Sequence, residues 1–256
     1  MSTWQERFSI AGRKALVTGA TKGIGAEIAH VFMQAGADVA AVGRDHEGFE
    51  AGRRAAADTG RDYFAIKADL STADGPQAAA KRALEHFGRI DILVNSAGVA
   101  LTDPILQASV GDWDLTMNVN LRAPFLLARA VAPGMIEREA GKIINISSQT
   151  GVIAMEDHAA YASSKGALNA LTKSMTAEWA RHNIQVNAIC PTVVMTPMGR
   201  RVWGPPEKRD PMLAKTPAGR FGEPVEIADC ALYLASPASD LINGALIMAE
   251  GGYTSL

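Results

Sequence analysis

Short apolar runs alternate with longer helical patterns along the whole chain. The apolar runs have the length of strands but no regular polar alternation, which is typical of strands buried on both faces of a parallel sheet. They cover residues 14–18, 37–43, 63–67, 90–96, 142–147, 184–190 and 245–249. Ala-rich helical spacing covers residues 23–36, 45–59, 74–88, 111–139, 157–182 and 224–236. With right-handed crossovers, this order predicts a doubly wound α/β fold: a parallel seven-stranded sheet with helices on both faces.

Residues 191–223 interrupt this alternation. They contain six prolines and no long periodic pattern. They follow a strand at its expected carboxyl end, where open α/β sheets bind their ligands. We therefore expect a substrate lid there. No linker or repeat divides the rest of the chain, so residues 1–256 are expected to form one domain.

The composition is that of an ordinary globular protein with a sizeable core. The 256 residues are 48% hydrophobic and carry a net charge of −2, so bulk charge favours neither nucleic acid nor an anionic membrane as a partner. Cys190 and Cys230 lie outside any metal-binding spacing, and no metal site is expected. No apolar run approaches the roughly 18 residues of a membrane span. Glu6 and Arg7 stand where a secretory signal needs apolar residues, so we expect a cytoplasmic protein.

A glycine-rich turn, TGATKGIG, directly follows the first predicted strand. Gly19, Gly23 and Gly25 let the backbone turn tightly and approach a pyrophosphate, which would lie at the N-terminus of the next helix. Thr21, Lys22 and Ile24 belong to the same turn. In a Rossmann-type unit this arrangement predicts a dinucleotide site. A plain strand–helix turn is the alternative.

The end of the second strand bears on the choice of cofactor. NAD is usually held there by an acidic residue, whereas a nearby arginine accommodates the 2′-phosphate of NADP. Gly43 stands in the place of the acid and Arg44 follows it, with Lys22 as a second positive charge. The pattern favours NADP(H) and leaves NAD(H) possible. In the alternative interpretation Arg44 and Lys22 are surface residues, and Asp45 is the ribose acid after a shift of two positions.

Tyr161 and Lys165 stand four residues apart in a predicted helix and so share one face. A cationic amine beside a phenol lowers the phenol pKa, which suits a tyrosine to general acid or base work. Ser148, at the end of a predicted strand, could donate to a substrate oxygen as charge develops on it. A helix with an incidental Tyr-x-x-x-Lys pair is the simpler alternative.

Taken together, the motifs resemble those of the short-chain dehydrogenase/reductase family over essentially the whole chain. They are TGATKGIG (18–25), NSAG (95–98), SS (147–148), YASSK (161–165), PTVVMT (191–196) and EGGY (250–253). The resemblance implies that Tyr161 exchanges a proton with the substrate oxygen while hydride passes to or from nicotinamide. It implies that Lys165 holds the nicotinamide ribose and lowers the tyrosine pKa, and that Ser148 orients and polarises the substrate oxygen. Asn120, in "VNL", would bind a water of the proton relay.

The resemblance also implies a set of cofactor contacts. Asp69 would contact adenine, with Leu70 beside it. The remaining contacts, besides the glycine turn, Tyr161 and Lys165, would be Asn95, Ala97 and Gly98 beneath the cofactor and Pro191, Val194 and Thr196 beside the carboxamide. Two positions depart from the usual family pattern, because Ser96 replaces an asparagine and Thr192 replaces a glycine.

Four segments are distinctive: INISSQT (144–150), PTVVMTPMGRRVW (191–203), EKRDPMLAKTPAGRFGE (207–223) and MAEGGY (248–253). They resemble the xylulose reductase branch of the family, which reduces small dicarbonyls and ketoses with NADPH. In that branch Gln149 and His158 would bind sugar hydroxyls beside Ser148 and Tyr161, and Trp203 would cover the pocket. A small carbonyl or alcohol substrate is therefore expected. Alternatively, His158 is a solvent-facing residue at the helix start, and Trp203 is a core or interface aromatic.

Other functions stay open at this point. Gluconate-type, threitol-type and aldose 1-dehydrogenases share much of the pattern, as do 3-oxoacyl-carrier-protein reductases. A regulator that senses NADPH without turnover is a non-enzymatic alternative, although it would not need the full set of Asn120, Ser148, Tyr161 and Lys165. Family members commonly form homotetramers, and we expect one here, paired through helices 111–139 and 157–182.

Overall fold

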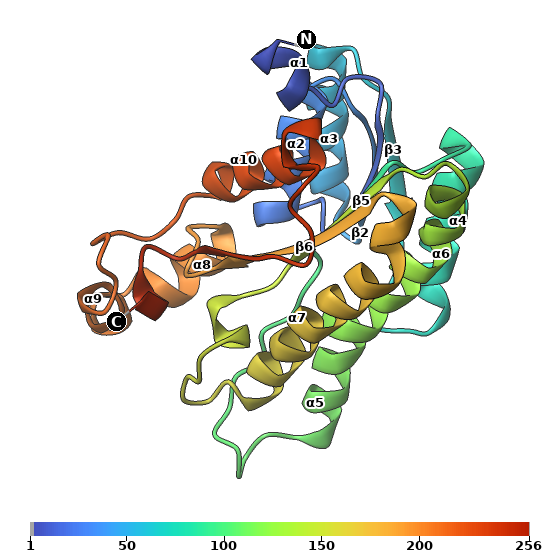
Figure 1. Cartoon of the computed structure of the whole chain (residues 1–256). Coiled ribbons are helices and arrows are strands. Elements are labelled where there is room, and N and C mark those ends of the chain that lie inside the picture. Colours follow the sequence, from blue (N-terminus) through green and yellow to red (C-terminus); the bar gives the residue numbers. More distant parts are fainter. Residues whose placement is uncertain (1–2, 256) are drawn as a thin grey trace.

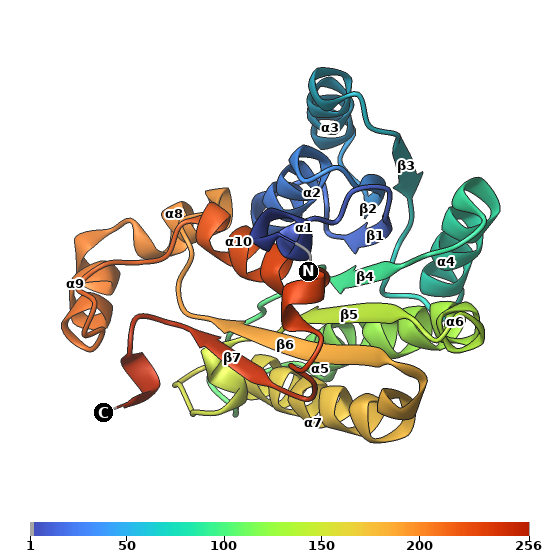
Figure 2. The same ribbon diagram turned by 45° about the horizontal axis from the view of Figure 1, so that its top comes forward.

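The computed structural model describes residues 3–255, so residues 1, 2 and 256 of the expected domain lie outside the described part. The described chain forms a single α/β domain around one seven-stranded sheet (Figures 1 and 2). Its strands are β1 (Lys14–Thr18), β2 (Asp38–Gly43), β3 (Tyr63–Lys67), β4 (Ile92–Asn95), β5 (Gly141–Ile146), β6 (Ile184–Pro191) and β7 (Leu246–Ala249). All seven lie within two residues of their predicted bounds.

The strand order is β3-β2-β1-β4-β5-β6-β7, and every neighbouring pair is parallel. The predicted doubly wound sheet is therefore confirmed. The chain adds strands outward from β1 to β3 and then crosses back to β4. This reversal between β1 and β4 creates a crevice at the carboxyl edge of the sheet, which is where doubly wound folds bind their ligands.

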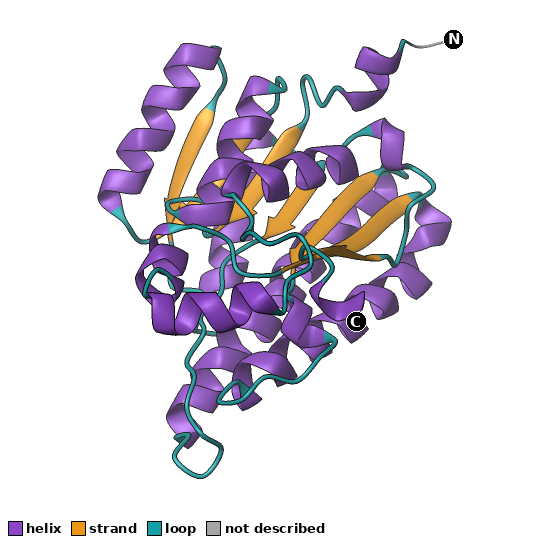
Figure 3. Ribbon diagram, turned by 90° about the vertical axis from the view of Figure 1, so that its left-hand side faces the viewer, coloured by secondary structure: helices purple, strands orange, loops and turns teal. Residues whose placement is uncertain are grey.

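Helices cover both faces of the sheet, as Figure 3 shows by the strands held between layers of helix. One layer consists of α2 (Gly23–Gln34), α3 (His46–Thr59) and α10 (Pro224–Ala235), and its core includes Ile28, Phe32 and Leu234. The other consists of α4 (Asp74–Phe87), α6 (Ala123–Glu137) and α7 (Ala159–Trp179), with Ala83, Leu127 and Met175 in its core. Because both faces are covered, β1 buries Ala15, Leu16 and Val17 completely.

The expected helix over residues 111–139 is in fact three consecutive elements. They are α5 (Val110–Met117), the π-helix η1 (Asn118–Arg122) and α6. The apolar spacing continues through all three, so it does not distinguish a wider π turn from an α-helix. Such π segments occur frequently at functional sites, and this one contains Asn120.

The segment 191–223 contains two short helices that the sequence pattern did not predict. Helix α8 (Pro197–Trp203) and helix α9 (Pro206–Ala214) each begin with proline, which fits the first turn of a helix because that turn needs no N–H donor. The two ends of the segment meet in a parallel bridge between Val194 and Gly222. The short helix α1 (Trp4–Phe8), also not predicted, begins with a capping box between Thr3 and Glu6.

Candidate active site

The residues expected to do chemistry converge at the carboxyl edge of the sheet. Ser148 directly follows β5, Asn120 lies in η1, and Tyr161 and Lys165 lie in the first two turns of α7. Helix α7 packs against η1 and against η2 (Gln149–Gly151), the short turn after Ser148. The fold therefore brings together four residues that are separated by up to 45 positions in the sequence.

Ser148 is held in a defined orientation beside Tyr161. Its Oγ accepts two hydrogen bonds from Thr150, one from the backbone N–H at 3.2 Å and one from the hydroxyl at 2.9 Å. A serine oxygen has two acceptor positions and one proton to give, so the Ser148 proton is left to donate to the Tyr161 hydroxyl, with which Ser148 is hydrogen-bonded. Thr150, itself buried, was not predicted as a site residue.

The pKa of Tyr161 differs from the expectation. Burial raises it above its ordinary value of 10.0, and the hydrogen bond with Ser148 opposes that rise. The expected lowering by Lys165 is not seen here, because the Lys165 Nζ donates to the Ile146 carbonyl at 2.8 Å and stands 5.6 Å from the centre of the tyrosine ring. In this structure the hydroxyl of Ser148, and not the amine, is what favours the phenolate.

The pKa of Lys165 is itself strongly shifted. Only 4% of the side chain is exposed, and burial lowers its pKa from 10.5 to about 8. No carboxylate among the described residues forms an ion pair with it. A buried, unpaired amine is costly to the fold, which is typical of a group kept for function.

Asn120 is completely buried and uses its side chain to fix the loop after β4. Its Oδ1 accepts from the Val99 N–H at 2.9 Å, and its Nδ2 donates to the Val99 carbonyl at 2.9 Å and to Ser164 Oγ at 3.0 Å. Ser164 in turn donates to the Tyr161 carbonyl. Because both N–H donors of the side chain are engaged, the water predicted for Asn120 would have to bind to the second acceptor position of Oδ1 or to the backbone of that residue.

The glycine turn has the close approaches that a dinucleotide site needs. A Cβ on Gly25 would lie 2.5 Å from the Gly19 carbonyl oxygen, and a Cβ on Gly19 would lie 2.9 Å from the Ala97 Cα. Gly23 has a positive φ of 58°, and a Cβ there would meet the Thr196 methyl at 3.0 Å. The backbone of Thr21, Lys22 and Ile24 thus leads into α2, and the glycines place no side chain over the N-terminus of that helix. The residues present therefore fit a pyrophosphate.

The basic residues proposed for the 2′-phosphate lie at the surface beside this turn. Arg44 and Lys22 are both exposed. Lys22 forms an ion pair with Asp45 at 3.4 Å, and Asp45 also accepts from the Gly48 N–H at the start of α3. Asp45 therefore acts as a helix cap, which argues against its alternative assignment as the ribose acid.

The loop after β3 holds Asp69 in place. The backbone N–H and hydroxyl of Ser71 donate to Asp69 Oδ1 at 3.0 and 2.8 Å, and these bonds hold the pKa of Asp69 below its ordinary value. Leu70 is buried against the second helix layer. The carboxylate of Asp69 remains largely exposed to a ligand.

The loop after β4 is anchored from below by Thr18. Its hydroxyl oxygen accepts from the N–H groups of Ser96 and Ala97 at 3.0 and 3.1 Å. Asn95 donates to Asn145 at 2.8 Å in the core of the sheet. A Cβ on Gly98 would stand 3.4 Å from Asn120 Oδ1 and 3.7 Å from Lys165 Nζ, so Gly98 lies close to both side chains.

The base of the 191–223 segment adjoins the glycine turn. Pro191 ends β6, Val194 forms the bridge to Gly222, and Thr196 caps α8 by accepting from the Gly199 N–H at 3.0 Å. Thr196 also approaches Gly23, as noted above. The residues expected around the carboxamide are thus next to those expected around the pyrophosphate.

The residues expected to bind substrate differ in their contacts with the Ser148–Tyr161 pair. Gln149 is 2% exposed and directly follows Ser148, and its Oε1 is buried without a hydrogen-bond partner. The His158 ring packs edge-on against the Tyr161 ring, with 6.3 Å between centroids, and its Nδ1 contacts the Glu156 carbonyl. Trp203 ends α8, half-buried. Within residues 3–255 no hydrogen bond or ring contact joins it to Tyr161 or His158.

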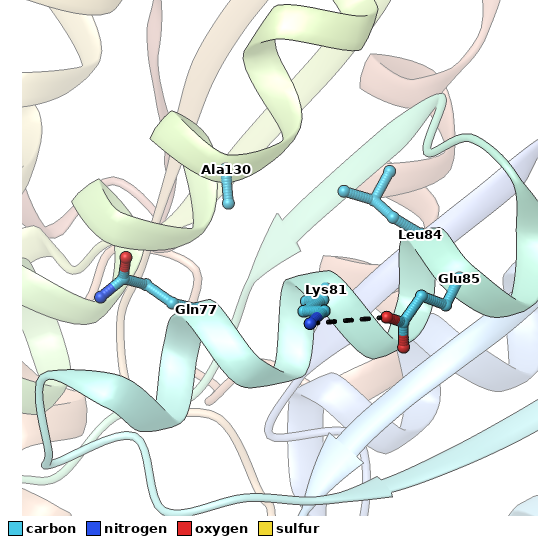
Figure 4. Close-up of a pocket in the computed structure, with 5 residues that line it drawn as sticks. All are labelled: Gln77, Lys81, Leu84, Glu85 and Ala130. Carbon is cyan, nitrogen blue, oxygen red and sulfur yellow. Dashed lines mark ion pairs between the residues drawn. The ribbon is translucent and has the colours of Figure 1, made fainter.

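A surface groove is lined by residues other than these. A groove of about 530 Å³ runs between α4 and α6 and is lined by Gln77, Lys81, Leu84, Glu85 and Ala130 (Figure 4). Lys81 and Glu85 form an ion pair at 3.7 Å. Because none of its lining residues belongs to the expected site, we do not assign it to substrate. In the described residues no cluster of His, Cys, Asp and Glu could hold a metal ion, and no helix is long and apolar enough to span a membrane.

Comparison with known proteins agrees with this geometry. A family model described as enoyl-(acyl carrier protein) reductase matches residues 19–254. The chain belongs to the short-chain dehydrogenase/reductase family. It is an NAD(P)-dependent oxidoreductase of that family, acting on the CH–OH group of donors or the corresponding carbonyl.

Similar members of the short-chain dehydrogenase/reductase family act on small polyols and sugars. The chain is 44% identical to the D-threitol dehydrogenase of Mycolicibacterium smegmatis, over 96% of this chain and 95% of that one. It is 39% identical to the NAD-dependent glycerol dehydrogenase of Listeria innocua, over 96% of each, and 42% identical to the L-xylulose reductase of Mus musculus, over 96% and 98%. A crystal structure of a gluconate 5-dehydrogenase from Burkholderia cenocepacia, in complex with NADP and tartrate, matches with a TM-score of 0.93 and 38% identity, over 99% and 100% of the chains.

Proposed function

We propose that the protein is an NADP(H)-dependent oxidoreductase that interconverts a carbonyl and a secondary alcohol on a small sugar, ketose or polyol. The observation that carries the proposal is the pairing of Ser148 with Tyr161 beside the buried amine of Lys165. Relatives named for threitol, glycerol and L-xylulose support a polyhydroxylated substrate.

Bound nicotinamide supplies the chemistry of hydride transfer. Tyr161 gives its proton to the substrate oxygen in reduction and removes it in oxidation. Through its one proton Ser148 stabilises the phenolate of Tyr161, and it bonds to the substrate oxygen when that proton turns from Tyr161 to the bound substrate. Lys165 holds the nicotinamide ribose and brings a positive charge close to the reacting groups, and Asn120 fixes the loop on which the cofactor lies.

Polar groups beside the catalytic pair suit a substrate rich in hydroxyls. Gln149 Oε1 and Thr192 Oγ1 are buried without partners at the carboxyl ends of β5 and β6. His158 contacts a carbonyl through Nδ1, so Nδ1 carries the proton of the neutral ring and Nε2 is left as an acceptor. Unpartnered polar groups of this kind penalise an apolar substrate and favour one that can bond to them.

The cofactor proposal rests on the end of β2. A Cβ on Gly43 would lie 2.4 Å from the Thr21 methyl, so the acid expected of an NAD enzyme would fit there only if the Thr21 side chain moved. Arg44 follows directly, and Lys22 supplies a second positive charge. The gluconate 5-dehydrogenase structure contains NADP, while the glycerol dehydrogenase is NAD-dependent, so the two cofactors must be compared directly.

The segment 191–223 would act as a substrate lid, with Trp203 over the pocket. A homotetramer would cover exposed apolar side chains on α5 and α6, such as Trp113 and Phe125. A 3-oxoacyl-carrier-protein reductase would need a basic patch near this lid. Arg200 and Arg209 are instead paired with Glu223 and Asp210, which weakens that alternative.

The proposal is tested by a substrate panel with both cofactors, followed by the absorbance of reduced nicotinamide. The panel holds threitol, xylitol, gluconate, glycerol, L-xylulose, diacetyl, several aldoses and a 3-oxoacyl thioester. We expect the highest kcat/KM on a polyol or ketose with NADP(H). The highest kcat/KM on the thioester or on an aldose C1, or NADPH binding with no turnover at all, would reject the proposal.

A further inference from the structure

Arg122, the last residue of η1, reaches the loop that carries Asp69. Its Nη2 donates to the Ser71 carbonyl at 2.6 Å, across 51 positions of sequence. Its Nε is buried without a hydrogen-bond partner. Among the described residues no carboxylate lies within ion-pair distance of this guanidinium. A partly buried charge held by one backbone carbonyl is costly, so its position calls for an explanation other than packing.

Ser71 is the residue that orients the Asp69 carboxylate. Both of its donors, the backbone N–H and the hydroxyl, bond to Asp69 Oδ1. The Asp69 carbonyl also accepts from the Thr72 hydroxyl at 3.2 Å, which closes the turn. The position of the carboxylate therefore depends on Ser71, and the position of Ser71 depends on Arg122.

The helical segment η1, from which Arg122 reaches the Asp69 loop, is itself held in place. Asn120, two positions before Arg122, makes three hydrogen bonds to Val99 and Ser164. Side chains two residues apart on a helix point in different directions. η1 therefore holds the loop after β4 with Asn120 and the loop after β3 with Arg122, and so fixes two parts of the cofactor crevice relative to each other.

We propose that Arg122 is a positioning residue for the adenosine half of the cofactor. It does not touch the cofactor and acts through Ser71 on Asp69. The inference rests on the proposed contact between Asp69 and adenine, and it is independent of which sugar or polyol is the substrate.

Ligands that contain only one half of the cofactor distinguish this positioning role from a general effect on the fold. Isothermal titration calorimetry measures the affinity of wild type, R122M and R129M for 2′,5′-ADP, which is the adenosine half, and for NADPH. Arg129, exposed on α6, is the matched control. We expect R122M to weaken both affinities by roughly tenfold, the value of one charge-assisted hydrogen bond, and R129M to leave them unchanged.

Kinetics with reduced nicotinamide mononucleotide, which lacks the adenosine half, give the second readout. R122M should keep the wild-type kcat/KM with this cofactor. An equal loss with the mononucleotide and the dinucleotide, or an unchanged affinity for 2′,5′-ADP, would overturn the proposal.

S71A provides a variant on an exposed loop in case R122M does not fold. It removes one of the two bonds that orient Asp69. The proposal requires weaker binding of 2′,5′-ADP by S71A with no change in kcat/KM for the mononucleotide, and unchanged 2′,5′-ADP binding would contradict it.

Discussion

Thr150 holds Ser148, the proposed partner of Tyr161, by two hydrogen bonds to one oxygen, at 3.2 Å from the Thr150 N–H and 2.9 Å from the Thr150 hydroxyl. Both acceptor positions of Ser148 Oγ are then filled, and its proton is directed to Tyr161. This favours the phenolate of Tyr161 against the burial that raises the phenol pKa. In the proposed mechanism Thr150 thus contributes to the acid–base chemistry by orienting Ser148.

Replacement of Thr150 by valine should therefore affect the pH profile as well as the rate. T150V keeps the shape and removes the hydroxyl donor, so the Ser148 proton is no longer confined to Tyr161 and the tyrosine pKa rises. We expect kcat/KM to fall by roughly tenfold, with the half-maximal pH for alcohol oxidation displaced upward. T150S, which keeps the hydroxyl, should restore both. A T150V profile with the wild-type midpoint would show that Thr150 does not act through Ser148.

Lys165 should reduce the stability of the fold at neutral pH. Its pKa is about 8 in the folded protein and near 10.5 when unfolded, so below pH 8 the charge is buried at full cost. The difference corresponds to about 3 kcal/mol, and loss of the bond to Ile146 offsets about 1 kcal/mol of it. K165M should be more stable than wild type by about 2 kcal/mol at pH 7 and inactive.

The pH dependence of this gain follows from proton binding. Between pH 8 and 10.5 the unfolded chain binds the Lys165 proton and the folded protein does not, so the stability of the wild type rises with pH. The advantage of K165M in urea unfolding should shrink over that range. K173M, at an exposed position of the same helix, is the control. A constant advantage, or none at pH 7, would contradict the assignment.

Arg44 should discriminate between the two cofactors. The 2′-phosphate is present only on NADP, so R44A should raise the KM for NADPH by roughly tenfold, the cost of one charged hydrogen bond, and leave the KM for NADH unchanged. R54A, exposed on the neighbouring helix α3, should change neither. An equal effect of R44A on both cofactors would place Arg44 outside the phosphate site.

Replacement of Gly43 by the acidic residue typical of an NAD enzyme should be unfavourable. Because a side chain there meets the Thr21 methyl, G43D alone should weaken the binding of both cofactors and lower the melting temperature. The double variant T21G/G43D removes the obstacle and should bind NADH better than G43D does. Steady-state KM values and thermal unfolding measure both effects. A G43D protein with normal stability and improved use of NADH would show that Thr21 is no barrier.

Much of the fold could be predicted because its signals are local. Strands without polar alternation and glycines after the first strand are visible in the sequence. The strand order confirmed the parallel, doubly wound sheet that the strands predicted. The π turn was not predictable, since the apolar spacing continues through Asn118–Arg122 and only the backbone reveals the wider turn. Helices α8 and α9 were missed because their prolines suggested a loop, although proline also begins helices.

Site residues that stand in recognisable motifs could be predicted from the sequence. Residues that act only through a contact in the folded protein could not. Tyr161, Lys165, Ser148 and Asn120 stand in short motifs, and the fold brings them together. Thr150 and Ser164 act through hydrogen bonds to Ser148, Asn120 and Tyr161, and Thr18 through hydrogen bonds to the N–H groups of Ser96 and Ala97. Thr18 and Ser164 lie within motifs, but the motifs do not show which groups their hydroxyls contact. The direction of the Tyr161 pKa was also beyond the sequence, because it depends on burial and on where the Lys165 amine points.

The most direct test of the central claim compares Y161F with wild type for turnover and for cofactor binding. Phenylalanine keeps the ring and removes the proton that the reaction needs, and general acid–base catalysis contributes at least about a hundredfold to rate. We predict that Y161F loses at least that factor in kcat on the best polyol or ketose, while its calorimetric affinity for NADPH stays at the wild-type value. Turnover by Y161F at the wild-type rate would contradict the account.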